Sequence, residues 1–403
     1  MNVMKNILLL STIYPAPDLH NGTPVCHYFA THWVKMGYNV KVVHVQAVYP
    51  QPLYWIASLF EEKIRAKTGA VIYTKRDKGI HHYEMDGVDI MRVALYKPIP
   101  HGAHPARQVR YLVNSIVQYN KSCSFVPDII VGHFHNPILE TVSRLKHIYG
   151  NVRTSIVMHD AGNGIVKTYP KQYEMLMKDV DIWGFRSEAF RRVFENNFGK
   201  CSKSFICYSG VPTRFIVERN EHYFNKPLSK YIYIGELIAR KYPASIIKPI
   251  AMTSNNILDR IVFIGSGAEK NNVEKAANEY HVFDKLVFAG KIPREQINDY
   301  LDESECFIMI SRDEAFGLVY LEAMARGCIV IGSRNEGIDG IIVDGVNGFL
   351  CEAGNTEELA SIIRKINDMS PEKRKCIADA GLETARKMTD EKVAELYVNA
   401  LVG

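Results

Sequence analysis

The sequence predicts an α/β protein of two domains, each built around a doubly wound parallel sheet. Short apolar, β-rich runs alternate with amphipathic stretches along the whole chain, which is typical of βα units around a parallel sheet. The 403 residues are too many for one compact core, and two domains of roughly 200 residues each are expected. Each half contains enough apolar runs to form a sheet of its own.

The apolar runs give the expected strands. In the first half these are residues 6–11, 39–44, 128–132, 154–159, 182–186 and 204–207. In the second half they are residues 230–234, 260–265, 285–289, 306–310 and 329–332. Helices are expected at 317–326 and, where apolar residues recur with helical spacing, at 390–401.

The domain boundaries follow from the breaks in this pattern. Residues 1–210 are expected to form the first domain, and residues 211–387 the second, which starts with a hinge of mixed polarity. Residues 388–403 are expected to form a helix that packs back on the first domain. The basic, aromatic interval of about 50–105 fits the βα pattern poorly, so an insertion, partly helical and partly hairpin, is expected there. Two similar halves favour a ligand between them, at the carboxyl ends of both sets of strands.

Composition excludes several classes of protein. No apolar run approaches the ~18 residues that span a bilayer. The apolar run at 7–10 is too short for a signal peptide, and the eight cysteines form no CxxC pair, so reduced thiols and a cytoplasmic location are expected. Residues 1–200 carry 24 basic and 15 acidic side chains, whereas residues 201–403 carry 25 and 29. The basic first half favours an anionic partner, although an ordinary solvated surface would explain it equally well.

The strongest chemical signal is the segment 311–327, which follows an expected strand. It places Glu314 on a loop and Glu322 in a helix, both near the carboxyl edge of the sheet. Gly317 lets the backbone amides at the helix start approach an anion, and a carboxylate beside them can accept two hydrogen bonds from a sugar or ribose diol. The alternative is a capped helix whose glutamates are merely solvated.

The run Glu314-Ala-Phe-Gly-Leu-Val-Tyr-Leu-Glu322 resembles the EX7E motif of retaining glycosyltransferase family 4 and departs from it only at Ala315. The resemblance covers nearly the whole chain, with gaps at 50–110, and implies the GT-B fold of two facing Rossmann-like domains. It implies that Glu314 contacts the hydroxyls of a donor sugar and that Glu322 holds the ribose of a nucleotide. The amides at Phe316, Gly317 and Leu318 would face the sugar and the diphosphate.

Further matches follow in the family's order. Asn21-Gly22-Thr23 lies after the first strand, where the resemblance implies that Gly22 touches the diphosphate, and His159-Asp160 implies that His159 lies at the donor sugar. In 235–241 the resemblance implies that Lys241 binds the diphosphate, but Glu236 stands where the family has arginine. Arg240 could supply the missing charge, because a departing nucleoside diphosphate needs about two positive partners; otherwise Arg240 and Lys241 are surface charges.

The base pocket and the acceptor side are less strongly marked. Two glycine turns resemble those that border the nucleotide base in the family, and they assign four candidates to donor binding: Gly265, Gly267, Lys291 and Ile292. His133 ends a strand that faces the cleft and is a candidate for acceptor contact. No metal site is expected: Asp179-Val-Asp181 spells a metal-binding DxD, but it precedes an apolar strand and lacks further ligands.

Together these features predict a metal-independent, retaining glycosyltransferase that needs no cofactor besides a nucleoside-diphosphate sugar. The expected acceptor is a saccharide hydroxyl on a lipid-linked molecule of the kind used to build bacterial surface polysaccharide. The expected location is cytoplasmic, with peripheral contact to the anionic inner membrane face and no nucleic-acid partner. Two alternatives stay open: a nucleotide-sugar 2-epimerase of the same fold, and an inactive nucleotide-sugar-binding homologue, which the departure at Glu236 would suit.

Overall fold

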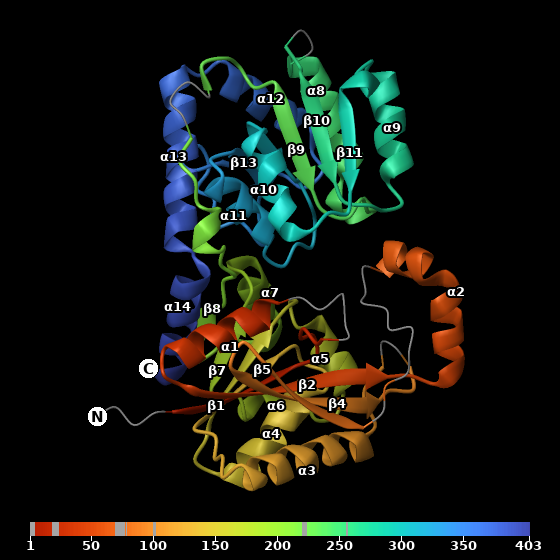
Figure 1. The fold of residues 1–403 in the computed structure, drawn as a ribbon, viewed down its shortest axis with the longest axis vertical. Coiled ribbons are helices and arrows are strands. Elements are labelled where there is room, and N and C mark those ends of the chain that lie inside the picture. The colour runs from red at the N-terminus through yellow and green to blue at the C-terminus, as the bar shows by residue number, and fades with distance from the viewer. Residues whose placement is uncertain are drawn as a thin grey trace.

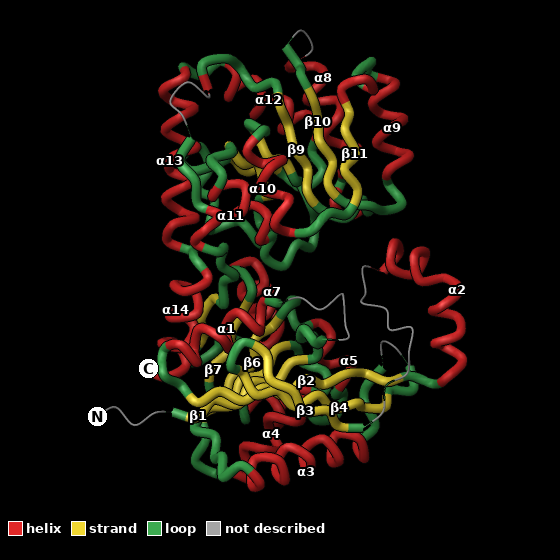
Figure 2. The backbone as a smooth tube through the Cα atoms, in the orientation of Figure 1, coloured by secondary structure: helices red, strands yellow, loops and turns green. Residues whose placement is uncertain are grey.

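The computed structural model describes residues 5–17, 24–68, 77, 79–99, 102–219, 224–254 and 257–403, with residues 61–68 and 254 described by their backbone only. The chain forms two α/β domains stacked along its longest axis, with helices flanking the strands of both sheets (Figures 1 and 2). This confirms the predicted fold class. No described helix is long and apolar enough to cross a membrane.

The first domain contains an eight-stranded sheet with the order β3-β4-β2-β1-β5-β6-β7-β8. All neighbours are parallel except the hairpin of β3 and β4. The strands are β1 (Asn6–Ser11), β2 (Asn39–Val48), β3 (Ile80–Met85), β4 (Val88–Tyr96), β5 (Ile129–His133), β6 (Arg153–Met158), β7 (Ile182–Phe185) and β8 (Ser204–Ile206). Its helices are α1 (Val25–Lys35), α2 (Gln51–Thr68), α3 (Ala106–Ser122), α4 (Ile138–Tyr149), α5 (Asn163–Thr168), α6 (Tyr173–Lys178) and α7 (Glu188–Phe198).

The sequence predicted an insertion, partly helical and partly hairpin, over about 50–105. The interval does contain a helix and a hairpin, but one strand of the hairpin belongs to the main sheet. It begins with α2, but β4 then lies beside β2 as a parallel strand of the main sheet, and Ile90 and Val93 are completely buried. Charged residues conceal this strand in the sequence. Asp89 pairs with Lys41 on β2, and Arg92 is buried within the domain. A buried strand that contains paired charges lacks the continuous apolar run on which the prediction relied.

The second domain contains a six-stranded parallel sheet with the order β11-β10-β9-β12-β13-β14. The strands are β9 (Lys230–Ile234), β10 (Arg260–Ile264), β11 (Leu286–Gly290), β12 (Cys306–Ile308), β13 (Ile329–Ser333) and β14 (Phe349–Cys351). The helices are α8 (Ile247–Ser254), α9 (Lys270–Glu279), α10 (Arg294–Asp302), α11 (Leu318–Ala325), α12 (Thr356–Asn367) and α13 (Pro371–Lys387). The strands of this sheet point toward the first domain (Figure 1).

The chain passes from the first domain to the second near Val211 and returns to the first near Thr389, and these two segments lie side by side. They form a parallel β-bridge, with hydrogen bonds from Val211 N to Met388 O (3.0 Å) and from Asp390 N to Val211 O (3.0 Å). The last helix, α14 (Asp390–Val402), then packs on α1 of the first domain. Its position is fixed by the buried indole of Trp33, which donates a hydrogen bond to Ala394 O at 2.9 Å.

Candidate active site between the domains

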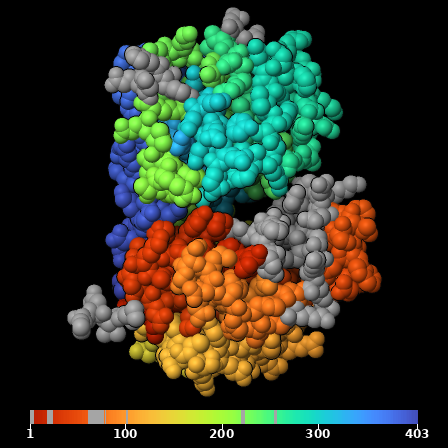
Figure 3. Space-filling model, viewed as in Figure 1, coloured from red at the N-terminus to blue at the C-terminus, as the bar shows by residue number. Residues whose placement is uncertain are grey.

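Each sheet has a point where its strand order reverses: between β1 and β5 in the first domain, and between β9 and β12 in the second. Ligands of open α/β sheets bind beyond the carboxyl ends of the strands at such points. The loops after these strands and their neighbours carry most of the residues selected from the sequence. The second domain's surface meets that of the first along the boundary visible in Figure 3.

Glu314 lies on the loop after β12 and faces two cations from the loop after β9. Its Oε2 is 3.1 Å from Lys241 Nζ and 3.8 Å from the Arg240 guanidinium, and the side chains of Glu314 and Lys241 are only 15% and 14% exposed. Arg240 also donates to the carbonyls of Arg312 and Asp313, both at 3.2 Å. The sequence therefore brings one carboxylate and two cations to one place. The single carboxylate offsets one of the two positive charges, and the charge that remains suits an anionic ligand such as a diphosphate.

The loop 336–340 holds Glu314 in position. Glu336 Oε2 accepts a hydrogen bond from Glu314 N at 3.0 Å, and Gly337 N donates to Glu314 O at 2.9 Å. Burial raises the pKa of Glu336, while the hydrogen bonds it accepts from backbone amides lower it. The contacts of the 336–340 loop therefore support the backbone of Glu314.

Gly317 precedes helix α11 and has the left-handed φ of +76°. A Cβ atom there would approach the Tyr320 ring to 2.5 Å, so a side chain would be both strained and crowded. Phe316 is buried, and its ring lies 6.2 Å from that of Tyr208 and 5.1 Å from the guanidinium of Arg186. The start of the helix, including Leu318, therefore lies against the first domain.

Glu322 is buried in α11 and accepts a hydrogen bond from Arg294 Nε at 2.6 Å. Arg294 also donates to the hydroxyl of Tyr28, on α1 of the first domain, at 3.3 Å. The sequence did not identify Arg294, because nothing local connects the start of α10 with a glutamate 28 residues later. The resulting contact joins the second carboxylate of the motif to the opposite domain.

The glycine turns after β10 and β11 lie next to the loop that follows β9. A Cβ atom at Gly265 would overlap Gly235 O, and one at Gly267 would overlap Leu237 O. Both glycines are therefore required for close packing of the two loops. Glu236, at the family's arginine position, is 4.0 Å from Lys291 Nζ, and Ile292 packs at the edge of the core. Gly22 lies outside the described residues.

On the first domain, His159 follows β6 and stacks on the Phe134 ring, with centroids 3.9 Å apart and planes at 16°. Its Nε2 lies 3.0 Å from His133 Nδ1, and His133 Nε2 lies 3.2 Å from the hydroxyl of Tyr397 on α14. Burial lowers the pKa of His133 to about 3, assisted by nearby Arg186. Burial also lowers the pKa of His159 well below its usual value, with further contributions from His133 and Arg186. Both imidazoles are therefore neutral near pH 7.

The prediction that His133 contacts the acceptor is wrong for this structure. The side chain is completely buried, and both ring nitrogens have protein partners. His133 ends the central strand β5 and is covered by α14. The residue pattern of a strand does not reveal which distant helix will cover it. His133 positions His159 instead.

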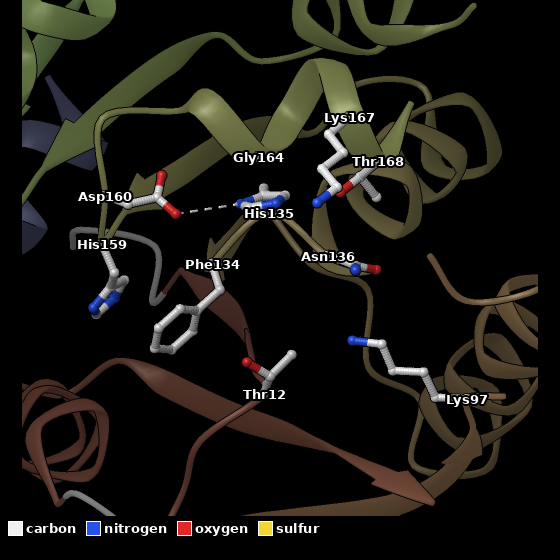
Figure 4. Close-up of a pocket in the computed structure, with 10 residues that line it drawn as sticks. All are labelled: Thr12, Lys97, Phe134, His135, Asn136, His159, Asp160, Gly164, Lys167 and Thr168. Atoms are coloured by element: carbon white, nitrogen blue, oxygen red, sulfur yellow. Dashed lines mark ion pairs between the residues drawn. The ribbon is translucent and has the colours of Figure 1, made fainter. Parts of the chain in front are cut away.

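A cavity of about 310 Å³, which we call the strand-end pocket, opens on the first domain next to His159 (Figure 4). It lies beyond the carboxyl ends of β1, β4, β5 and β6. Its lining residues are Thr12, Lys97, Phe134, His135, Asn136, His159, Asp160, Gly164, Lys167 and Thr168. Apart from His159, the sequence assigned no role to these residues.

Within the described part of the chain, no group of three or more His, Cys, Asp or Glu side chains could hold a metal ion. The two aspartates of the DxD sequence have protein partners: Asp181 pairs with Lys146 at 2.6 Å and Asp179 with His147 at 3.1 Å.

Residues 215–383, which contain the Glu314–Lys241 and Glu322–Arg294 pairs, match the family model for glycosyl transferases group 1. The match covers most of the second domain and none of the first, so the family describes what the second domain is similar to.

Curated proteins that are similar to this chain come from several organisms. N-acetyl-alpha-D-glucosaminyl L-malate synthase of Bacillus anthracis is 31% identical over 129 residues, 32% of this chain and 33% of its own length. The amylovoran biosynthesis glycosyltransferase AmsK of Erwinia amylovora is 24% identical over 360 residues, 84% of this chain and 85% of its own. The lipopolysaccharide core biosynthesis glycosyltransferase LpsE of Rhizobium meliloti is 29% identical, over 42% of this chain and 48% of its own. The alignments thus span between a third and most of these relatives.

Solved glycosyltransferase structures share the whole architecture. Sucrose-phosphate synthase from Thermosynechococcus elongatus superposes with a TM-score of 0.67 at 17% identity, over 98% of both chains. Anabaena HepE in complex with UDP and glucose superposes with a TM-score of 0.65 at 16% identity, over 99% of both chains. At these identities the likeness shows the fold, which is GT-B.

Proposed function

We propose that this protein is a retaining, metal-independent glycosyltransferase that moves a sugar from a nucleoside diphosphate to a saccharide hydroxyl. The observation that carries the proposal is the contact of Glu314 with Lys241 at 3.1 Å and Arg240 at 3.8 Å, at the strand ends of the domain that matches glycosyl transferases group 1. A carboxylate for sugar hydroxyls and two cations for a diphosphate are what a nucleotide-sugar site requires.

In the proposed step, the acceptor oxygen forms a bond to the anomeric carbon on the face from which the diphosphate departs. The bond between that carbon and the phosphate oxygen breaks, and the acceptor's proton passes to the departing phosphate. Lys241, Arg240 and the amides that begin α11 at Gly317 stabilise the negative charge on the leaving group. Glu314 and the neutral His159 orient the sugar, and Glu322 holds the ribose.

The choice of acceptor rests on the relatives. AmsK is named for amylovoran biosynthesis and LpsE for lipopolysaccharide core biosynthesis, which supports a role in cell-surface polysaccharide synthesis with a lipid-linked acceptor. HepE has been solved in complex with UDP-glucose, which supports a nucleotide-sugar donor for a chain of the same fold.

Peripheral membrane contact is part of the proposal, and α2 supports it. The helix stands apart from the body of the first domain (Figure 1) and exposes Trp55 (62%), Ile56 (49%), Leu59 (76%) and Phe60 (47%). Trp55, Ile56 and Leu59 share one face of the helix before Phe60, where the backbone leaves the helical conformation (φ −129°, ψ 21°) and α2 is kinked. Buried Tyr54 anchors the first turn by accepting a hydrogen bond from Tyr49 N at 3.1 Å. Such a face can enter the headgroup layer of a membrane at the cytoplasmic surface.

Vesicle flotation tests the membrane contact. We expect the protein to float with anionic vesicles, and Trp55→Ser and Leu59→Ser each to lower binding about five- to tenfold, because each removes apolar area from the lipid. Met252→Ser, which removes an equally exposed apolar side chain from the second domain, should not change binding. Equal effects of all three variants would contradict a role for α2.

Thermal shift against a panel of nucleoside diphosphates and their sugars tests the donor site. A bound nucleotide is expected to raise the melting temperature, and Lys241→Ala is expected to abolish the shift. Isomerisation of a free nucleotide sugar without an acceptor would instead indicate an epimerase. Absence of any shift across the panel would contradict the proposal.

A further inference from the structure

The strand-end pocket contains two lysines that come from separate elements. Lys97 follows β4 and Lys167 lies on α5, and Figure 4 shows both ammonium groups pointing into the space between them. Neither forms an ion pair with a residue in the described part of the chain. Burial lowers the pKa of Lys97, because its charge is partly removed from water. The pocket therefore contains positive charge that has no ion-pair partner among the residues that the structure describes.

Asp160, the acidic residue of the pocket, does not supply that partner. Its Oδ1 accepts a hydrogen bond from Gly162 N at 2.7 Å, and its Oδ2 lies 3.9 Å from His135 Nδ1 (dashed line in Figure 4). The carboxylate is thus directed toward its own loop and toward His135. A ligand that supplies its own negative charge would pair with the half-buried Lys97 and would also lie within the field of the exposed Lys167 on the opposite side of the pocket.

Asn136 also lines this pocket (Figure 4). Its Nδ2 donates to Gly102 O at 3.0 Å, and its Oδ1 is enclosed and has no hydrogen-bond partner among the described residues. A sugar hydroxyl would pair with this oxygen only after the side chain turned toward the pocket.

We propose that the strand-end pocket binds the acceptor as an anionic saccharide, with its phosphate or carboxylate between Lys97 and Lys167. This inference rests on the proposed function, since His159 lines the pocket and is also assigned to the donor sugar. The cations for the donor diphosphate belong to the other domain, so the two lysines here are free to recognise the acceptor.

Acceptor kinetics test this inference. Three matched methyl glycosides are compared: a neutral hexoside, its 6-phosphate and the corresponding uronic acid. We expect KM to be at least about tenfold lower for one or both anionic acceptors than for the neutral one, because charged hydrogen bonds are the stronger ones. Preference for the phosphate over the uronic acid, or the reverse, identifies the anionic group.

Variants then test whether the two lysines cause the preference for an anionic acceptor. Lys97→Met and Lys167→Met are each expected to raise KM for the preferred anionic acceptor about ten- to a hundredfold, with little change for the neutral one. Lys97→Arg should restore most of the preference, since it keeps the charge. Lys171→Met, at an exposed lysine three residues beyond the pocket, is the matched control and should change neither KM.

The inference can fail separately from the proposed function. If wild-type protein cleaves or transfers from a nucleotide sugar but uses neutral and anionic acceptors equally, the pocket does not select for charge and the inference is overturned. The same follows if Lys97→Met and Lys167→Met weaken nucleoside-diphosphate binding rather than acceptor use. The proposed function fails instead if no nucleotide sugar is bound or turned over, or if the protein only isomerises the free nucleotide sugar.

Discussion

The two sides of the domain interface hold their charges in different ways. On the second domain each carboxylate of the motif already has a cation: Glu314 has Lys241, and Glu322 has Arg294. On the first domain the histidines are neutral, and the lysines of the strand-end pocket have no ion-pair partner among the described residues.

This difference indicates what each side has to do. Under the proposed function, the paired charges on the second domain would exchange partners when a diphosphate and a sugar bind, so that neither carboxylate of the motif is left alone. On the first domain only the half-buried Lys97 is partly removed from water without an ion-pair partner among the described residues, and a negatively charged ligand would therefore be favoured beside it. The predictions below test each side in turn, from the largest expected effect to the smallest.

Loss of the charges around Glu314 should have the largest effect. Lys241→Ala and Glu314→Gln are each expected to lower kcat/KM for sugar transfer about 10²- to 10³-fold, because each removes a fixed charge aimed at the reacting diphosphate or sugar. Lys275→Ala, at an exposed lysine on α9, is the control and should keep full activity. Activity within about threefold of wild type in both site variants would contradict the assignment of the donor site.

Gly317→Ala should destabilise the second domain by about 3 kcal/mol, since it combines a left-handed φ of +76° with an approach of 2.5 Å to the Tyr320 ring. Gly345→Ala offers a matched control: its φ is +73°, but no atom lies within 4 Å of the added Cβ. It should cost only about 1 kcal/mol. Chemical denaturation measures both, and equal losses would show that crowding at the helix start is unimportant.

Glu322→Ala should cost about 2 kcal/mol in the free energy of unfolding, because Arg294 keeps its largely buried charge and loses its carboxylate. The affinity for a nucleoside diphosphate should fall at the same time, since the ribose loses its acceptor. Isothermal titration calorimetry and denaturation provide the two measurements. Glu305→Ala would not serve as a control, because that side chain caps the start of β9; Glu295→Ala, at an exposed site of α10, does.

The neutral histidines of the first domain should make the fold sensitive to acid. His133 has a pKa of about 3 in the folded protein against an ordinary value of 6.5, so the folded state binds fewer protons than the unfolded state between these values. The free energy of unfolding should therefore fall as the pH drops below about 6.5, by about 1 kcal/mol between about pH 7.5 and 5.5. His133→Asn should remove this part of the slope. An unchanged slope in the variant would mean that other groups account for it.

Sequence alone predicted many of the strands in both domains. β1 and β9 were predicted to the residue, because a central parallel strand is a continuous apolar run. Glu314 and Glu322 were selected because the short segment that contains both resembles a family motif, and their roles stay predictions. β4 was not assigned to the sheet, since its paired charges interrupt the apolar pattern.

The contacts that shape the first domain's side join residues far apart in the chain. His133 meets Tyr397 across 264 residues, and Arg294 meets Tyr28 across 266. No local period or spacing encodes such contacts. The same applies to the strand-end pocket, where Lys97 and Lys167 converge only because β4 and β6 end at the same edge of the sheet.

The most direct test of the central claim is the release of nucleoside diphosphate from a panel of nucleotide sugars by the purified protein. Slow hydrolysis without an acceptor requires only the donor site, so no acceptor needs to be known. We predict that at least one nucleotide sugar is cleaved, and that Lys241→Ala lowers the rate at least about a hundredfold while Lys275→Ala leaves it unchanged. Cleavage that persists undiminished in Lys241→Ala, or no cleavage and no binding of any nucleotide sugar, would contradict the account.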